Sequence, residues 1–196
     1  RDSSTSRGLG DVYKRQVVAT SDAGNGIGGT AFRLRGSDAS RINVTTNGVP
    51  MNDAESHSVY WYDTPDMASS VGTIQVQRGA GTSTNGTGAF GGSVNMTTAP
   101  MSSEFSGEAS LSYGSYNTNK QSLQIGSGLM GGHWTVDARL SHISSDGYVD
   151  RAFTNLESYM LQVGYYDGGT AVKLISFGGV ARVGPVSYTH LRAHET

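Results

Sequence analysis

Two glycine-rich stretches have the spacing G-x-G-x-x-G, which in nucleotide-binding proteins cradles a pyrophosphate. The glycines are Gly24, Gly26 and Gly29 in one stretch and Gly86, Gly88 and Gly91 in the other. This chemistry requires a helix at the third glycine, because the helix N-terminus provides the field that holds the phosphates. The segments that follow, TAFRLRG and GSVNMTT, favour strands instead. We therefore predict no nucleotide site in either stretch.

The histidines and serines form no recognisable catalytic or metal-binding motif. His57, His133 and His142 lack the H-E-x-x-H and H-x-x-E-H spacings of metal sites, and the chain contains no cysteine. No G-x-S-x-G segment marks a nucleophilic serine. The sequence predicts no enzyme, no metal and no cofactor. A hydrolase that uses scattered Ser and His residues is the competing hypothesis, and no particular serine can be named for it.

One aromatic cluster could face a ligand. Tyr60, Trp61 and Tyr62 follow His57 in a segment that Pro65 prevents from forming a strand. These three aromatic residues are candidates for the ligand side of the molecule. The competing interpretation is that they pack beneath neighbouring strands.

Composition limits the class of protein. The chain has 196 residues with 14 Lys+Arg against 16 Asp+Glu, and this balance predicts no nucleic-acid partner. Charged residues are 15% of the chain, against about 25% in a typical soluble domain. The chain contains no run of about 18 or more apolar residues, so the sequence predicts no membrane-spanning helix. The mean hydropathy of -0.34 is nevertheless compatible with a membrane β-barrel, because each barrel strand alternates apolar and polar residues.

The two ends of the chain differ from the interior. Residues 1–16 (RDSSTSRGLGDVYKRQ) are polar and basic, without the apolar core of a signal peptide. We interpret residues 1–16 as a non-native leader and residues 181–196 as a non-native tail, with ordinary disordered ends as the alternative. Residues 17–100 and 101–180 are then two successive domains.

The interior reads as short strands separated by turns rich in glycine. In residues 17–100 the expected strands lie at 30–36, 42–52 and 71–79, with an Asn47-Gly48 turn inside the second. The segment DMASS is expected to begin a short helical turn. After Pro100 the segments before TAVKLISFGG alternate apolar and polar residues. HWTVDARLSHI, for example, places Asp137 and Arg139 opposite an apolar row.

The joints between the later segments suggest a membrane barrel. LMGGHW and YYDGGTAV predict tight turns, whereas SSDGYVDRAFTNLES predicts a longer polar loop. Short turns on one rim and longer loops on the other are typical of outer-membrane barrels. Several aromatic residues near strand ends fit interfacial girdles. The alternative is a soluble β-sandwich that serves as a binding or adhesin module.

Three motifs, in order and spacing, resemble the plug domain of TonB-dependent outer-membrane receptors: FRLRG, NVTTNGVPMND and IQVQRGAGTSTNGTGAFGGSVNMTT. The family shows F-x-I-R-G, a strand ending in D-G-V-P, and I-E-V-x-R-G-P before a glycine loop and G-G-x-I-N-I-x-T. Asn47 replaces the usual Asp and Ala80 the usual Pro. The resemblance covers about residues 17–179.

The resemblance implies a fold and a role. The fold is mainly β, a small mixed plug domain followed by the first antiparallel strands of an incomplete transmembrane β-barrel. The role is that of a receptor in the outer membrane of a Gram-negative bacterium. It would take up a scarce or bulky nutrient, such as a siderophore, cobalamin, oligosaccharide or peptide. Its partners would be the membrane lipid, the extracellular ligand and TonB, which binds a box N-terminal to the plug by strand addition. As written, the chain is expected to be a piece that does not transport alone and that aggregates without detergent.

The resemblance also assigns roles to residues. Arg35 and Arg78 would pair with carboxylates of the barrel wall on later strands, because an unpaired buried charge costs about 3–5 kcal/mol. The glycines expected to form the tight turns of the plug are Gly36, Gly48, Gly79, Gly88, Gly91 and Gly92.

Overall fold

The computed structural model describes residues 17–184 apart from residues 22, 29, 35, 80–89 and 150, and only the backbone at residues 17, 18, 62 and 78. The chain divides into two compact units. Unit 1 contains Arg1–Thr20, Thr30–Tyr60 and Gly72–Thr98, and unit 2 contains Ser21–Gly29, Trp61–Val71 and Ala99–Thr196. The described residues form strands and short 3-10 helices with no α-helix, which confirms the mainly β prediction.

Unit 1 is built on a four-stranded mixed sheet. Its strands follow the order β4-β3-β6-β5, and a separate two-stranded sheet pairs β1 with β2. Strands β3 and β6 run parallel, and β3 and β4 form an antiparallel hairpin. The core between these elements buries Leu34, Ile42, Val44, Val94 and Met96. The bounds are β1 Val17–Ser21, β2 Thr30–Leu34, η1 Ala39–Arg41, β3 Ile42–Thr46, β4 Val49–Pro50, β5 Val71–Arg78 and β6 Gly92–Thr98.

The β3–β4 hairpin turns at Asn47 and Gly48. Both residues have positive φ, 51° and 82°, which is the backbone of a type I′ turn and favours an Asn-Gly pair. The Asn47 amide also ties the turn to β6, because its Nδ2 donates to Thr98 Oγ1 at 3.2 Å and its Oδ1 accepts from Thr98 N at 3.1 Å. An aspartate could accept the second bond but could not donate the first. This double contact explains why asparagine suits this chain.

The remaining predicted turn glycines lie at different kinds of position. Gly36, Gly79 and Gly92 have positive φ, and Gly88 lies outside the described residues. Gly91 permits a close approach of chain segments, since an added Cβ would lie 2.6 Å from Ser37 Cβ. Its N–H donates to the Arg41 carbonyl at 2.8 Å.

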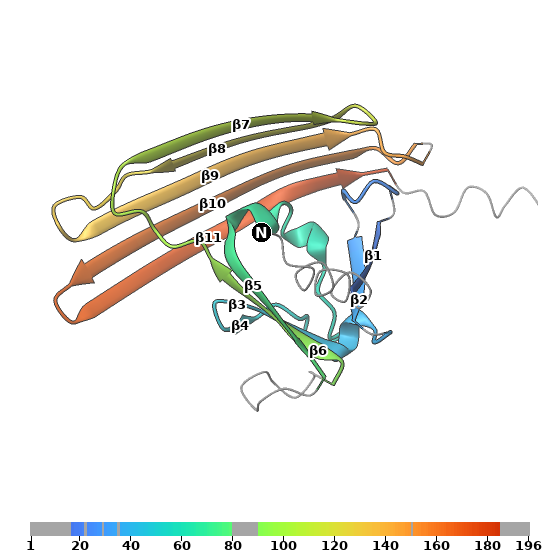
Figure 1. Cartoon of the computed structure of the whole chain (residues 1–196), viewed down its shortest axis with the longest axis horizontal. Coiled ribbons are helices and arrows are strands. Elements are labelled where there is room, and N and C mark those ends of the chain that lie inside the picture. The colour runs from blue at the N-terminus through green and yellow to red at the C-terminus, as the bar shows by residue number, and fades with distance from the viewer. Residues whose placement is uncertain are drawn as a thin grey trace, which may run out of the picture. The chain divides into compact units, whose positions relative to one another are not determined.

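Unit 2 is built on a five-stranded antiparallel sheet, called here the strand sheet, in the order β11-β10-β9-β8-β7 (Figure 1). Each strand pairs with its neighbour in sequence, as expected for successive hairpins. Strand β11 continues to Val183, three residues past the expected boundary at 180. The bounds are η2 Trp61–Asp63, η3 Met67–Ser70, β7 Ser106–Gly114, β8 Thr118–Gly126, β9 Trp134–Ser145, β10 Thr154–Asp167 and β11 Thr170–Val183.

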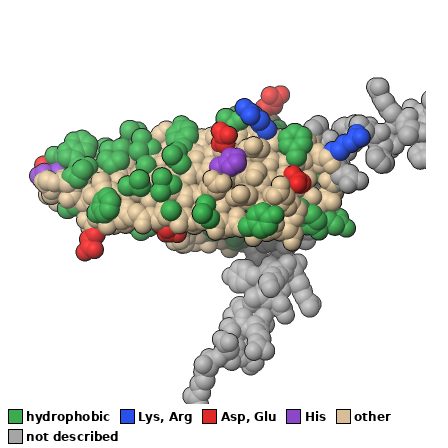
Figure 2. Space-filling view, turned by 90° about the horizontal axis from the view of Figure 1, so that it is seen from above, with side chains coloured by type: hydrophobic (Ala, Val, Ile, Leu, Met, Phe, Trp, Pro, Cys, Tyr) green, Lys and Arg blue, Asp and Glu red, His purple; other side chains and the backbone are tan. Residues whose placement is uncertain are grey.

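The two faces of the strand sheet differ sharply. On the inner face, β9 buries Thr135, Arg139 and Ser141, whereas on the outer face Leu140 is 59% exposed. The predicted alternation of β9 is therefore confirmed. Apolar side chains extend over the outer face, with few charged side chains among them (Figure 2). In a soluble sandwich this apolar row would be buried against a second sheet, so its exposure argues against that alternative.

The hairpins alternate between two ends of the sheet. At one end, Gly131, Gly132 and His133 form a tight loop that is closed by paired backbone bonds between Met130 and Trp134. At the same end β10 turns into β11 through two residues between Asp167 and Thr170. The opposite end carries the three-residue β7–β8 turn and the longer connection 146–153. Within the described part of the chain, no helix has the length and apolarity needed to cross a membrane.

Candidate functional site

A buried carboxylate joins the segment before β5 to the inner face of the strand sheet. Asp66 lies between η2 and η3 with a left-handed backbone (φ 53°, ψ 28°), and only 7% of its side chain is exposed. Its Oδ1 accepts from Ser69 Oγ at 2.7 Å and from Lys120 Nζ at 2.8 Å. Its Oδ2 accepts from Arg139 Nη1 at 2.8 Å and from Ser141 Oγ at 2.6 Å. All four bonds come from side chains, so the carboxylate is fully engaged.

Arg139 is the second centre of this network. Its Nε donates to Ser70 Oγ at 2.7 Å and its Nη2 to the Asp66 carbonyl at 3.1 Å. Its side chain is also 7% exposed, whereas that of Lys120 is 30% exposed. The guanidinium therefore donates hydrogen bonds to one backbone carbonyl, that of Asp66, and to the side chains of Asp66 and Ser70. We call the set Asp66, Ser69, Ser70, Lys120, Arg139 and Ser141 the Asp66 cluster.

Other contacts hold the same segment on the strand sheet. An added Cβ at Gly179 of β11 would come within 2.5 Å of Pro65 Cγ, so the proline ring packs directly on the strand. The η2 helix lies against β11, and the Ala99 N–H donates to the Ser70 carbonyl at 3.0 Å. Residues 61–71 are thereby attached at several points, although both flanking stretches belong to unit 1.

The network sets the ionisation of Asp66. Burial raises the pKa of the Asp66 carboxyl, but hydrogen bonds from Lys120, Ser141 and Ser69, together with the charge of Lys120, outweigh burial. The pKa therefore lies below its ordinary value of 3.8. The carboxylate is charged at neutral pH and is held between two cations.

This lowered pKa predicts a pH dependence of stability. A carboxyl group whose pKa is lower in the folded than in the unfolded chain stabilises the fold above its unfolded pKa, and that contribution is lost as pH falls through the folded pKa. We expect the urea midpoint to fall as the pH drops below about 4, in part through Asp66. The Asp66→Asn chain should show a smaller fall over the same range. Equal falls in the two chains would contradict the assignment.

The residues predicted from the sequence are distributed differently. Arg35 and the side chains of Arg78 and Tyr62 lie outside what the structure describes, so the pairing of the two arginines stays a prediction. Among the described residues, the ion pairs of the Asp66 cluster place acid and base in the reverse arrangement to the one predicted for Arg35 and Arg78. Here the acid precedes β5 and the cations Lys120 and Arg139 lie on strands.

The aromatic candidates follow a well-ordered loop of unit 1. Asn52 accepts from Val44 N at 2.7 Å and donates to the carbonyls of Ile42 and His57 at 2.9 and 2.8 Å. These bonds hold the loop that ends at Tyr60, a residue that is 51% exposed. Trp61, in η2, is half-buried. An exposed Tyr60 on a fixed loop is compatible with a ligand-side role, which stays a prediction.

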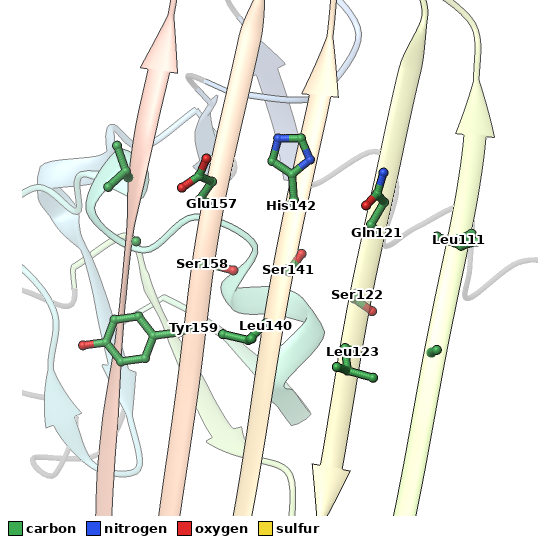
Figure 3. Close-up of a pocket in the computed structure, with 13 residues that line it drawn as sticks. Leu111, Gln121, Ser122, Leu123, Leu140, Ser141, His142, Glu157, Ser158 and Tyr159 are labelled. Atoms are coloured by element: carbon green, nitrogen blue, oxygen red, sulfur yellow. The ribbon is translucent and has the colours of Figure 1, made fainter.

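The outer face of the strand sheet carries a hollow of about 680 Å³. Gln121, His142 and Glu157 form a row across β8, β9 and β10 at one side of it, and Leu123, Leu140 and Tyr159 lie below (Figure 3). The hollow is predominantly apolar and opens away from the Asp66 cluster, because Leu140 and Arg139 point to opposite faces. Within the described residues, no group of three or more His, Cys, Asp or Glu side chains could hold a metal ion.

Comparisons with known proteins agree with this geometry. The family model for the TonB-dependent receptor plug domain matches residues 2–93, a range that includes Asp66 and part of the expected leader. No curated protein matches the sequence.

Solved structures share the fold over most of this chain. They include the copper transporter OprC, with 24% identity, a TM-score of 0.66 and 86% of this chain covered. The ferric citrate transporter FecA has 22% identity, a TM-score of 0.61 and 86% coverage. The ferripyoverdine receptor of Pseudomonas aeruginosa has 16% identity, a TM-score of 0.61 and 76% coverage. The chain spans 27%, 28% and 20% of the lengths of these three proteins, respectively.

The fold and the matched segment define a class: a receptor plug domain followed by antiparallel strands of a receptor barrel. Residues 2–93 match the TonB-dependent receptor plug domain, and solved TonB-dependent receptors share the fold over most of the chain. Asp66 lies within the segment that matches the plug domain, and its partners Lys120 and Arg139 lie on β8 and β9 of the strand sheet.

Proposed function

We propose that the chain forms the plug and first wall strands of an outer-membrane receptor that imports a scarce or bulky nutrient with energy supplied through TonB. One observation carries this proposal. A segment within the plug match is fixed by a buried ion cluster to the polar inner face of strands whose outer face is apolar. This arrangement is what a plug inside a lipid-facing barrel requires.

The outer face fits a lipid environment. Trp134 and Tyr165, with ring centroids 4.8 Å apart, lie at the end with the tight turns, and Tyr116 and Tyr148, 5.5 Å apart, lie at the other end. Aromatic residues favour the two membrane interfaces. We assign the end with the two-residue β10–β11 turn to the periplasm and the end with the 146–153 connection to the outside, since periplasmic turns are the shorter ones.

The nutrient is proposed only as a class. The solved relatives include receptors for ferripyoverdine and ferric citrate and a copper transporter, which favour a metal ion or its chelate. Cobalamin, an oligosaccharide or a peptide are the other candidates. Tyr60 and its aromatic neighbours would contact the ligand from the plug side.

Uptake in cells tests the function. The full reading frame that contains this chain would be expressed in Gram-negative hosts with and without TonB, and uptake of labelled iron chelates, copper, cobalamin, oligosaccharides and peptides measured. We expect an outer-membrane protein and uptake of one class only in the host with TonB. Equal uptake without TonB, or a protein found outside the outer membrane, would overturn the proposal.

A further inference from the structure

We propose that Lys120, Arg139 and Ser141 form a carboxylate-binding site on the strand sheet, which Asp66 fills as an internal ligand and which a carboxylate-bearing molecule can fill in its place. The site goes beyond the proposed function, because it is defined by the inner face alone. Only its use by a passing solute rests on the proposed transport.

The strands supply three donors to one carboxylate, and they reach both oxygens. Lys120 Nζ donates to Oδ1 at 2.8 Å, while Arg139 Nη1 and Ser141 Oγ donate to Oδ2 at 2.8 and 2.6 Å. Each oxygen therefore has its own cation. Charge-assisted bonds of this kind are the strong ones. A single-atom anion such as chloride cannot occupy both positions, so the arrangement selects for a two-oxygen group.

The balance of charge on the inner face also favours an anion. By strand register, its charged residues in β7–β11 are three cations, Lys120, Arg139 and Lys173, and two carboxylates, Glu108 and Asp137. The strand face alone thus carries one excess positive charge, which Asp66 neutralises. If the plug segment withdrew, the buried guanidinium would lose its carboxylate, and leaving such a charge uncompensated is unfavourable.

Other hydrogen bonds join the strands to the segment around Asp66 without involving the Asp66 carboxylate. Arg139 Nε binds Ser70 Oγ and Nη2 binds the Asp66 carbonyl, and Lys120 Nζ also donates to Ser69 Oγ at 2.6 Å. These contacts favour Asp66 over a free carboxylate in the intact chain. Removing only its carboxylate should open the site while keeping the segment attached.

Chemical rescue of the Asp66→Ala chain in detergent micelles tests the site. We expect sodium acetate to restore, with saturation, a part of the melting temperature that the substitution removes, because a ligand that binds only the folded chain stabilises it. Sodium chloride at the same ionic strength should restore less. If the variant does not fold in chloride, its refolding yield replaces the melting temperature, and acetate must then raise that yield.

Three matched chains decide the outcome. In the unsubstituted chain and in Asp66→Asn the side chain at position 66 still occupies the space of the site, so acetate should act on them no more than chloride does. The double variant Asp66→Ala/Arg139→Gln should show no specific rescue. Equal effects of acetate and chloride on Asp66→Ala, or specific rescue that survives Arg139→Gln, would overturn the proposal. Because none of these measurements involves TonB or uptake, this failure is distinguishable from failure of the transport function.

Discussion

Replacing Asp66 with alanine is expected to lower the free energy of unfolding by about 3–5 kcal/mol, because it leaves the buried Arg139 guanidinium without its carboxylate. The side chains of Asp66 and Arg139 are each 7% exposed, so water cannot substitute fully for the lost partner. A total stability of about 5–15 kcal/mol is usual for a folded protein, so the loss would be large. Urea denaturation in detergent micelles measures it.

A matched substitution at an exposed ion pair shows how much of the stability loss is due to burial of the Asp66 pair. Asp38 also pairs with an arginine, Arg33, at 3.5 Å, but their side chains are 67% and 68% exposed. Asp38→Ala should therefore cost at most about 1 kcal/mol. If Asp66→Ala costs no more than Asp38→Ala, the Asp66 cluster does not stabilise the fold. The pair Asp66→Leu/Arg139→Leu should cost less than either single change, since neither charge is then left alone.

Placing an arginine at the centre of the outer face is expected to impair membrane insertion. Leu161 lies midway along β10 in the apolar band, and an arginine on the lipid face near the bilayer midplane costs about 2–4 kcal/mol. We expect Leu161→Arg to reduce the fraction of chain that inserts into lipid vesicles. Protection of the strands from added protease measures this fraction.

The control lies on the same face near the end of a strand. Ser144 faces outward on β9, close to the proposed headgroup level, where an added arginine costs only about 0–1 kcal/mol. Ser144→Arg should therefore insert almost as the unsubstituted chain does. Equal loss for both variants would show that added charge, rather than depth in the membrane, is responsible. Equal insertion of both would contradict a lipid-facing surface.

The strands were predictable because each obeys a local rule. In β9, strict alternation assigns Arg139 to one face and Leu140 to the other without knowledge of any partner strand. The Asn47-Gly48 pair likewise specifies a turn through its own backbone preference. The short helix in DMASS was foreseen for the same reason, as η3 from Met67 to Ser70 shows.

The Asp66 cluster was not predictable from such rules. Its surroundings, TPDMASS, mark a break between strands but say nothing about what the carboxylate meets. The only usable signal was an arginine on the inner face of an alternating strand, which must find an acid. That requirement names a kind of partner but not its position. The predicted pairing of Arg35 and Arg78 concerns other residues and stays a prediction.

The parts of the Asp66 cluster are far apart along the chain, and this affects the order in which the molecule assembles. Asp66 precedes Lys120 by 54 residues and Arg139 by 73. During synthesis the carboxylate is therefore made long before β9, and its main bonds can close only after that strand has formed. Contacts between such distant segments tend to form late in folding. Interactions that are absent from the folding transition state mainly slow unfolding. The cluster should therefore lower the rate of unfolding, which delays detachment of the segment that carries Asp66 once the strands have formed.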